Sequence, residues 1–307
     1  MKMDILVSLI FYVNFLVMFI LVLVSVSFFT LFERKLLSYI QLRLGPNKVG
    51  FMGLFQAFSD GMKLFSKEIL WLFQVEFIIY FFSPVYMFFN SLILWILYPF
   101  YYNMIVFNNF FLMVICILSL NIYPMMFLGC FSNSFYSLLG GIRSISQTIS
   151  YEVSFILMIF CYLMFLENFN LINMGEMFLL LYPIMLIFFC SLMAELNRTP
   201  FDFSEGESEL ISGYNIEYMG GVFAFVFLGE YLSIMFLMYF FCLMNFISAY
   251  MIMMSFMFFF VILIRGVLPR FRYDKLMFMV WMNYLPITLN YLMFILLLKY
   301  YLFLMLY

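Results

Sequence analysis

The sequence contains no histidine and very few charged side chains. Of its 307 residues, 10% are Asp, Glu, Lys or Arg, whereas 68% are hydrophobic. A soluble domain has about a quarter of its residues charged and about half apolar. Polar side chains are therefore too few to cover a globule in water, and we expect the chain to be solvated by lipid. The absence of histidine also removes the commonest metal ligand and the commonest base at neutral pH.

Cysteine pairs and a strong net charge are also missing. The five cysteines are scattered through apolar stretches and never form a Cys-x-x-Cys pair; they are Cys116, Cys130, Cys161, Cys190 and Cys242. Cysteines of this kind usually act as small buried hydrophobic side chains, so we expect neither a metal site nor an iron–sulfur site. The net charge of -2 gives no support for a nucleic-acid partner.

Long apolar runs predict an all-α membrane protein. A helix needs about 20 apolar residues to cross the bilayer core. Eight such runs predict about eight transmembrane helices, and no segment is polar enough for a separate soluble domain, so residues 1–307 are expected to form one membrane domain. The predicted spans lie near residues 5–31, 77–100, 104–130, 143–165, 176–195, 217–245, 248–268 and 283–305. The first run is too long for a signal-peptide core, so no cleavable presequence is expected.

Lysine and arginine gather on alternate connections. Twelve of the 14 basic residues fall in the odd-numbered connections: six in the first, one each in the third and fifth, and four in the seventh. The second, fourth and sixth connections contain none. Because basic loops stay on the inner side of a membrane, this pattern places the odd connections inside and both termini outside.

The first inner connection also contains an amphipathic segment at 51–70. Its apolar side chains recur every three or four residues, at Phe51, Phe55, Phe58, Met62, Phe65 and Ile69. At about 100° per residue they form one stripe, and Gln56, Asp60, Lys63 and Lys67 lie opposite it. This pattern predicts a helix in the membrane interface. A plain surface anchor and a role in admitting a lipid-soluble substrate are both compatible with it.

Negative charge is concentrated in the fifth connection and continues into the adjacent spans. Residues 194–218 contain six carboxylates and one base, Arg198; the carboxylates are Glu195, Asp202, Glu205, Glu207, Glu209 and Glu217. Two more glutamates lie inside apolar spans. Glu152 is roughly 14 Å along the helix from Arg143, and Glu230 is roughly 20 Å from Glu217 if that helix is straight.

A carboxylate inside a span indicates a specific environment. It costs about 2.5–3.5 kcal/mol at the helix centre, so a retained one usually faces a cavity, a partner or an ion path. We expect Glu152, Glu195, Glu217 and Glu230 to form a ladder that exchanges protons. The alternative is that each one is neutral or salt-bridged and only specifies helix packing. Ion pairs between the acidic connection and the basic connections on the same side are also expected.

Several stretches together resemble one family. They are ERKLLSYIQLRLGPNKVG with QAFSDGMKLFSKE, GGIRSISQTISYE, AELNRTPFDFSEGESELISGYNIEY and RGVLPRFRYDKLM. In the same order along nearly the whole chain, they are similar to the subunit 1 family of mitochondrial respiratory complex I, the NADH–ubiquinone oxidoreductase chain 1 family. The composition agrees with an organelle genome, because Phe (47), Met (29) and Tyr (23) are abundant whereas the GC-encoded alanine is rare.

The resemblance implies a core membrane subunit of a proton-pumping NADH:ubiquinone reductase in the mitochondrial inner membrane, with no redox centre of its own. Ubiquinone would be a substrate at a shared site, whereas NAD, FMN and the iron–sulfur clusters would belong to partner subunits. The partners would be the quinone-site subunits of the peripheral arm, neighbouring membrane-arm subunits and the lipid bilayer.

The resemblance also assigns residues by motif. The quinone tunnel would be lined or flanked by Arg34, Asp60, Lys63, Phe227 and Arg270. The loop facing the quinone cavity would contain Asp202, Glu205, Glu207 and Glu209. The acidic route would consist of Glu152, Glu195, Glu217 and Glu230. One departure is Gly229, where the family often has alanine.

Two other classes of function compete with this interpretation. A stand-alone proton or cation transporter would explain the buried glutamates, but transporters usually show internal repeats, and none is apparent. A purely structural anchor would explain the basic loops, but it gives no reason for Glu152 and Glu230. Purification separates the classes, because only the complex subunit would co-migrate with flavin and iron–sulfur absorbance.

Overall fold

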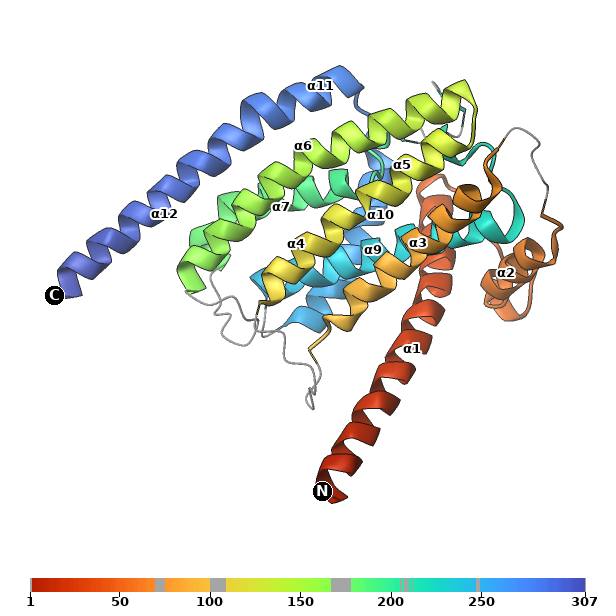
Figure 1. Cartoon of the computed structure of the whole chain (residues 1–307), viewed down its shortest axis with the longest axis horizontal. Helices are drawn as coiled ribbons and strands as arrows, with labels where there is room; N and C mark the ends of the chain where they lie inside the picture. The colour runs from red at the N-terminus through yellow and green to blue at the C-terminus, as the bar shows by residue number, and fades with distance from the viewer. Residues whose placement is uncertain are drawn as a thin grey trace.

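The chain folds into a bundle of helices (Figure 1). The computed structural model describes residues 2–69, 75–99, 109–166, 178–204, 206, 210–211, 213–246 and 249–306. Its α-helices are α1 (Lys2–Ile40), α2 (Gln56–Ser66), α3 (Phe77–Ile96), α4 (Phe110–Leu120), α5 (Ile122–Phe131), α6 (Phe135–Leu166), α7 (Phe178–Glu195), α9 (Gly220–Asn245), α10 (Tyr250–Val267), α11 (Tyr273–Phe278) and α12 (Leu285–Leu306). Short turns of 3₁₀-helix are η1 (Phe51–Gly53) and η3 (Gly213–Asn215), and a π-helical segment, η4 (Met279–Tyr284), joins α11 to α12.

Length and composition support the membrane assignment. Within the described ranges, seven helical stretches are long and apolar enough to cross a bilayer, and α7 is a shorter apolar helix beside them. The expected all-α membrane protein is therefore confirmed. The described stretches that could span are Ile10–Ile40, Phe77–Ile96, Phe110–Phe131, Phe135–Phe165, Gly220–Asn245, Tyr250–Val267 and Tyr273–Met305.

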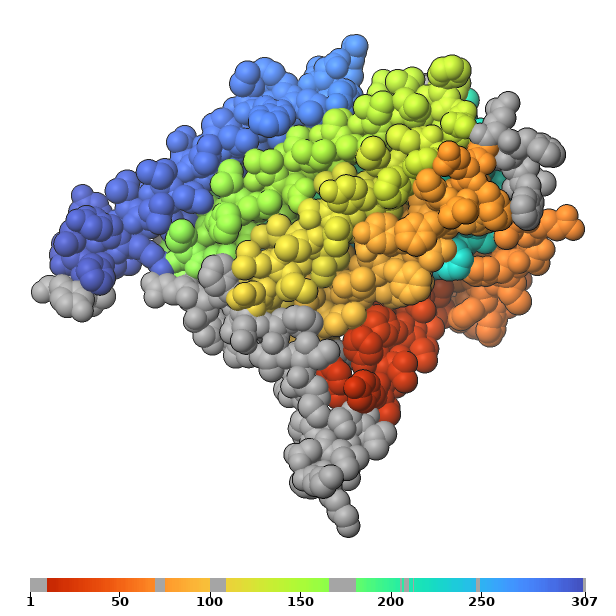
Figure 2. All heavy atoms as spheres, in the orientation of Figure 1, coloured from red at the N-terminus to blue at the C-terminus, as the bar shows by residue number. Residues whose placement is uncertain are grey.

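Helix α9 forms the centre of the bundle. Most of its side chains are buried, and it packs against α1, α2, α3, α7 and α10. Aromatic side chains fill this core; Phe188 of α7, for example, lies 5.8 Å from Phe241 of α9 between ring centroids. Around this core, α12, α6, α5 and α3 lie side by side in that order and form one face of the molecule (Figure 2).

Two helices extend beyond the compact bundle. The N-terminal part of α1 and the C-terminal part of α12 point away from the other helices (Figure 1). Their side chains are correspondingly exposed, as Leu16 on α1 and Phe303 on α12 show. Exposed apolar helices of this kind are solvated by lipid or by partner helices.

Several helix boundaries differ from those expected. The amphipathic segment is α-helical only over Gln56–Ser66, because Gly50, Met52 and Gly53 before it have positive φ angles that break a helix. Helix α6 begins at Phe135, eight residues before the expected start at 143, and Gly129 and Gly141 allow α5 and α6 to pack closely there: a Cβ on Gly141 would lie 2.9 Å from the Cα atom of Gly129. The last span continues back through η4 to Tyr273.

The basic connections meet at one end of the bundle. Helix α2, the turn between α5 and α6, and α11 all lie toward the end opposite the C-terminus (Figure 1). There Arg34 of α1 forms an ion pair with Asp60 of α2, and Lys35 Nζ donates to the carbonyl oxygen of Met52 at 2.8 Å. These contacts hold the amphipathic helix against the inner end of α1.

Candidate functional site

A buried ion cluster fixes the start of the acidic connection. The side chain of Glu33 on α1 is only 6% exposed. Its Oε1 accepts a hydrogen bond from Arg198 Nη1 at 2.7 Å and another from Arg265 Nη1 on α10, and its Oε2 accepts one from the Tyr231 hydroxyl at 2.6 Å. The Arg198 guanidinium also lies 4.4 Å from the centroid of the Tyr231 ring, in a cation–π contact. One carboxylate thus joins three helices to the connection between α7 and α9; we call these four residues the Glu33 cluster.

The charge on Arg198 is stabilised within this cluster. Burial alone opposes a charge, but Glu33, Tyr231 and Glu230 together outweigh it and hold the pKa of Arg198 above its ordinary value. Glu230 also contributes a favourable electrostatic interaction. Arg198 is therefore a permanent cation between the two glutamates.

Gln147 of α6 also holds this connection in place, through two hydrogen bonds. The Gln147 side chain of α6 is fully buried, and its Nε2 donates to the carbonyl oxygens of Ala194 and Phe201, both at 2.9 Å. These carbonyls directly precede Glu195 and Asp202 in the chain. Gln147 and the Glu33 cluster therefore fix both ends of the turn that presents the two acids.

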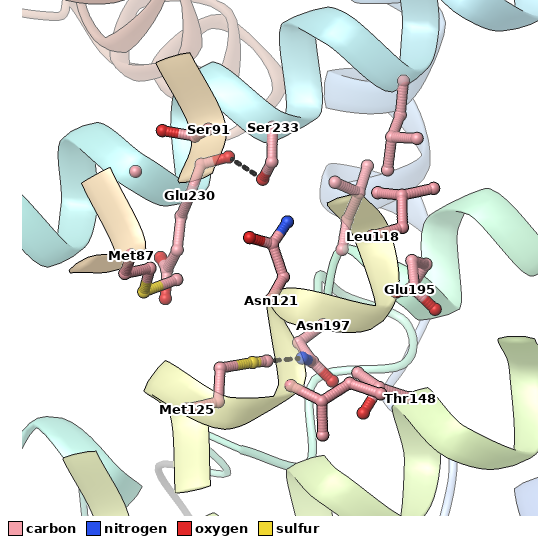
Figure 3. A pocket seen from close by; sticks show the side chains of 14 residues that line it. Met87, Ser91, Leu118, Asn121, Met125, Thr148, Glu195, Asn197, Glu230 and Ser233 are labelled. Carbon is pink, nitrogen blue, oxygen red and sulfur yellow. Dashed lines mark hydrogen bonds between the residues drawn. The ribbon is translucent and has the colours of Figure 1, made fainter. Parts of the chain in front are cut away.

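Glu195 and Glu230 line one internal cavity, which we call the central cavity (Figure 3). It has a volume of about 40 Å³ and is bounded by α3, α4, α5, α6, α9 and the end of α7. Its polar lining includes Ser91, Asn121, Thr148, Glu195, Asn197, Glu230 and Ser233. The Glu195 Oε2 atom is buried and has no hydrogen-bond partner. The two acids thus border the same cavity, together with several apolar side chains.

Glu230 also lines an adjoining cavity on the side of the acidic connection. This loop cavity has a volume of about 50 Å³ and shares Leu196, Asn197 and Glu230 with the central cavity. Its other lining residues are Arg198, Thr199, Asp202, Ser204, Phe227, Tyr231 and Arg265. Phe227 lies one turn before Glu230 on α9, so one helix presents an aromatic ring and a carboxyl to the same space.

A tyrosine from the connection anchors Glu230. The Tyr214 hydroxyl of η3 donates to Glu230 Oε1. The turn can approach α6 this closely because Gly140 has no side chain there: a Cβ would lie 3.0 Å from the Cα atom of Gly213. The connection thus helps to hold the Glu230 side chain in place.

The other two predicted proton-route acids occupy different positions. Glu152 is half-buried on α6, one turn beyond Thr148, and interacts electrostatically with Glu195. Glu217 lies before the start of α9 and is absent from the lining of both cavities. Its backbone carbonyl accepts a hydrogen bond from Tyr80 at 2.7 Å, and the Tyr80 ring stacks on Tyr218. Glu195 and Glu230 thus share a cavity whose lining includes neither Glu152 nor Glu217.

The predicted tunnel residues fall into two groups. Arg34 and Asp60 pair with each other where α1 meets α2, and Lys63 is exposed on α2. Phe227 and Asp202 line the loop cavity. Arg270 forms an ion pair with Asp202, with Arg270 Nη2 at 3.6 Å from Asp202 Oδ2. This last pair confirms the expected attraction between the acidic and basic connections. Glu205, Glu207 and Glu209 lie outside the described residues.

Sequence reasoning missed several residues of this region. Glu33 was not singled out because it stands beside Arg34 and Lys35, although an acid at the end of an apolar span was a usable signal. Arg265 belongs to a basic connection that was expected to pair with the acidic connection, but not with Glu33. Tyr214, Tyr231 and Asn121 are neutral polar side chains for which the linear sequence gave no signal. In the part of the chain that the structure describes, no group of three or more Cys, Asp or Glu side chains could hold a metal ion.

Comparison with known proteins identifies the family. A family model described as NADH dehydrogenase matches residues 13–296. The NADH-ubiquinone oxidoreductase chain 1 of Aedes aegypti is 47% identical over 95% of this chain and 96% of its own length. The protein of the same name from Locusta migratoria is 47% identical, covering 92% and 94% respectively, and that from Strongylocentrotus purpuratus is 42% identical, covering 88% and 89%. The chain therefore belongs to the NADH dehydrogenase family, among the NADH-ubiquinone oxidoreductase chain 1 proteins.

Proposed function

We propose that this chain is a core membrane subunit of the proton-pumping NADH:ubiquinone oxidoreductase, respiratory complex I. It forms part of the ubiquinone access tunnel and couples quinone reduction to proton translocation through buried glutamates. The names of its relatives support the enzyme class, and the apolar helices support a multi-pass position in the mitochondrial inner membrane. The distribution of basic residues supports a location of both termini on the intermembrane-space side.

The observation that carries the proposal is the position of Glu230 between two cavities. On one side it faces Phe227 and Asp202, and on the other it faces Glu195. A change in charge in the loop cavity acts on Glu230 over a short distance in a region of low dielectric constant, where electrostatic interactions are strong. Glu230 can therefore pass a protonation change to the central cavity.

The quinone route would begin at the amphipathic helix. Helix α2 packs against α1 and α9, and the Phe65 ring of α2 meets the Phe225 ring of α9 edge-on at 6.1 Å. Its exposed apolar side chains suit a hydrophobic tail, while Arg34, Asp60 and Lys63 provide a polar edge. Phe227 and the Asp202–Arg270 pair would then flank the headgroup end of the passage.

The proton route would use Glu230, Glu195 and Glu152. Glu217 would connect this route to the inner surface of the membrane. The acidic connection, with Asp202, Glu205, Glu207 and Glu209, would sense the negative charge that develops when quinone is reduced. NAD, FMN and iron–sulfur clusters would be held by partner subunits of the peripheral arm. Neighbouring membrane-arm subunits would receive the coupling signal from Glu152.

Replacing Phe227 with tryptophan tests the quinone part of the proposal. The larger ring would crowd the loop cavity and weaken a quinone-site inhibitor by roughly tenfold, within the range expected for overpacking of about 1–3 kcal/mol. The measurement is the half-inhibitory concentration of that inhibitor for NADH:quinone reduction in membranes. Phe256→Trp is the matched control, because Phe256 is 63% exposed on α10. Equal inhibition of the Phe227→Trp variant and the wild type would contradict the proposed tunnel wall.

A further inference from the structure

The central cavity has a polar residue with no role in the function proposed above. Asn121 lies at a break between α4 and α5, where it ends one helix and begins the next. The break has an identifiable cause: Pro124 has no N–H group, so it cannot donate to the carbonyl oxygen of Leu120 four residues earlier. Asn90 of α3 donates to that carbonyl instead, at 3.4 Å. The bundle thus maintains an irregular point in an apolar span, and Asn121 occupies it.

The Asn121 amide points into the central cavity, between the Glu230 side and the side formed by Asn197 and Glu195 (Figure 3). Its Oδ1 atom is buried and has no hydrogen-bond partner. Neighbouring lining residues on α4 and α5, Leu118, Ile122 and Met125, are apolar. Asn121 is therefore the polar group that these two helices contribute to the cavity lining.

Three unpaired acceptor atoms share this cavity. They are Asn121 Oδ1, Glu195 Oε2 and Asn197 Oδ1. A buried acceptor without a hydrogen bond costs about 1–3 kcal/mol, and acceptors cannot satisfy one another. Water can donate to all three, and the space is large enough for a few water molecules. The lining thus has the chemistry of an internal water site.

We infer that Asn121 is a positioning residue that holds the water through which Glu195 and Glu230 exchange a proton. This inference depends on the proton route proposed above. One carboxyl group gives its proton to a bound water molecule, which releases another proton to the second carboxylate and is thereby restored. Asn121 accepts a hydrogen bond from that water and keeps its own protonation state throughout.

A matched pair of variants tests this role in the assembled complex. Threonine and valine have nearly the same shape, but only threonine offers an oxygen to water. We expect Asn121→Val to lower coupled turnover with a short-chain ubiquinone by roughly threefold to tenfold, the effect of losing one net hydrogen bond. Its KM for that quinone stays unchanged, and its solvent deuterium isotope effect increases. Asn121→Thr retains most of the wild-type turnover.

Two outcomes overturn the inference without affecting the proposed proton route. The first is equal turnover and an equal isotope effect in the Asn121→Val and Asn121→Thr complexes, while Glu195→Gln is impaired. The second needs no variant: a structure of the wild-type complex that resolves water molecules but shows none within hydrogen-bonding distance of Asn121 Oδ1. If Glu195→Gln and Glu230→Gln both pump at the wild-type rate, the proton route itself is wrong.

Discussion

Replacing Glu33 with glutamine is expected to prevent normal accumulation of the assembled complex. Glutamine keeps the size of the side chain and an acceptor for Tyr231, but it removes the carboxylate that bridges Arg198 and Arg265. Removing one partner of a buried ion pair costs about 3–5 kcal/mol. The measurements are the yield of intact complex on native gels and the temperature at which the purified complex aggregates.

Two further variants show whether charge is the cause. Arg34→Gln removes a charge from the adjacent position, but this side chain is 54% exposed and its pair with Asp60 lies at the surface. Such a pair contributes at most about 1 kcal/mol, so the complex should assemble. The double variant Glu33→Gln with Arg198→Gln restores the net charge of the cluster and should recover part of the loss. Similar yields for Glu33→Gln and the wild type would show that the cluster does not hold the connection.

Glu230→Gln is expected to abolish most coupled proton pumping while leaving the complex assembled. The amide keeps an oxygen that can accept the hydrogen bond from Tyr214, yet it cannot release or take up a proton at neutral pH. Loss of a positioned acid or base typically slows a proton-transfer step by about 100-fold or more. Proton uptake per NADH oxidised, measured in sealed vesicles, gives the coupling directly.

Glu195→Gln should have the same effect, because the proposed route passes through both carboxyl groups in series. Glu76→Gln is the matched control: Glu76 lies at the start of α3 and is exposed. Tyr214→Phe tests the coupling to the acidic connection, since it removes the hydrogen bond to Glu230 and leaves the carboxyl in place. Wild-type pumping by both the Glu195→Gln and Glu230→Gln variants would refute the glutamate route.

Local patterns in the sequence predicted the membrane helices and polar surroundings for Glu195 and Glu230, but spacing alone did not show that the two acids border one cavity. Long apolar runs report burial in lipid, and a carboxyl inside such a run reports a polar interior. The Asp202–Arg270 pair was also predictable. The positions of Lys and Arg place the acidic fifth connection and the basic seventh connection on the same side of the membrane, where opposite charges can meet.

The Glu33 cluster could not be predicted in the same way. It joins residues of α1, α9, α10 and the connection after α7, so it depends on how distant helices pack. Asn121 was missed for a related reason, because only its burial shows that its oxygen lacks a partner. Glu217 lines neither cavity because α9 begins at Gly220, so Glu217 belongs to the turn before the helix.

Helix α1 has one property that sets it apart from α3, α5, α7 and α12: it contains neither proline nor glycine along its 39 residues. Sharp bends in helices almost always occur at such residues, so α1 has no point at which to flex. At 1.5 Å per residue it is about 58 Å long, nearly twice the thickness of the hydrocarbon core, and an overlong helix adjusts to a thinner bilayer by tilting. Because α1 does not bend, a change in its tilt also moves Glu33 and the Arg198 side chain paired with it. The geometry around the acidic connection is therefore sensitive to the thickness of the surrounding lipid.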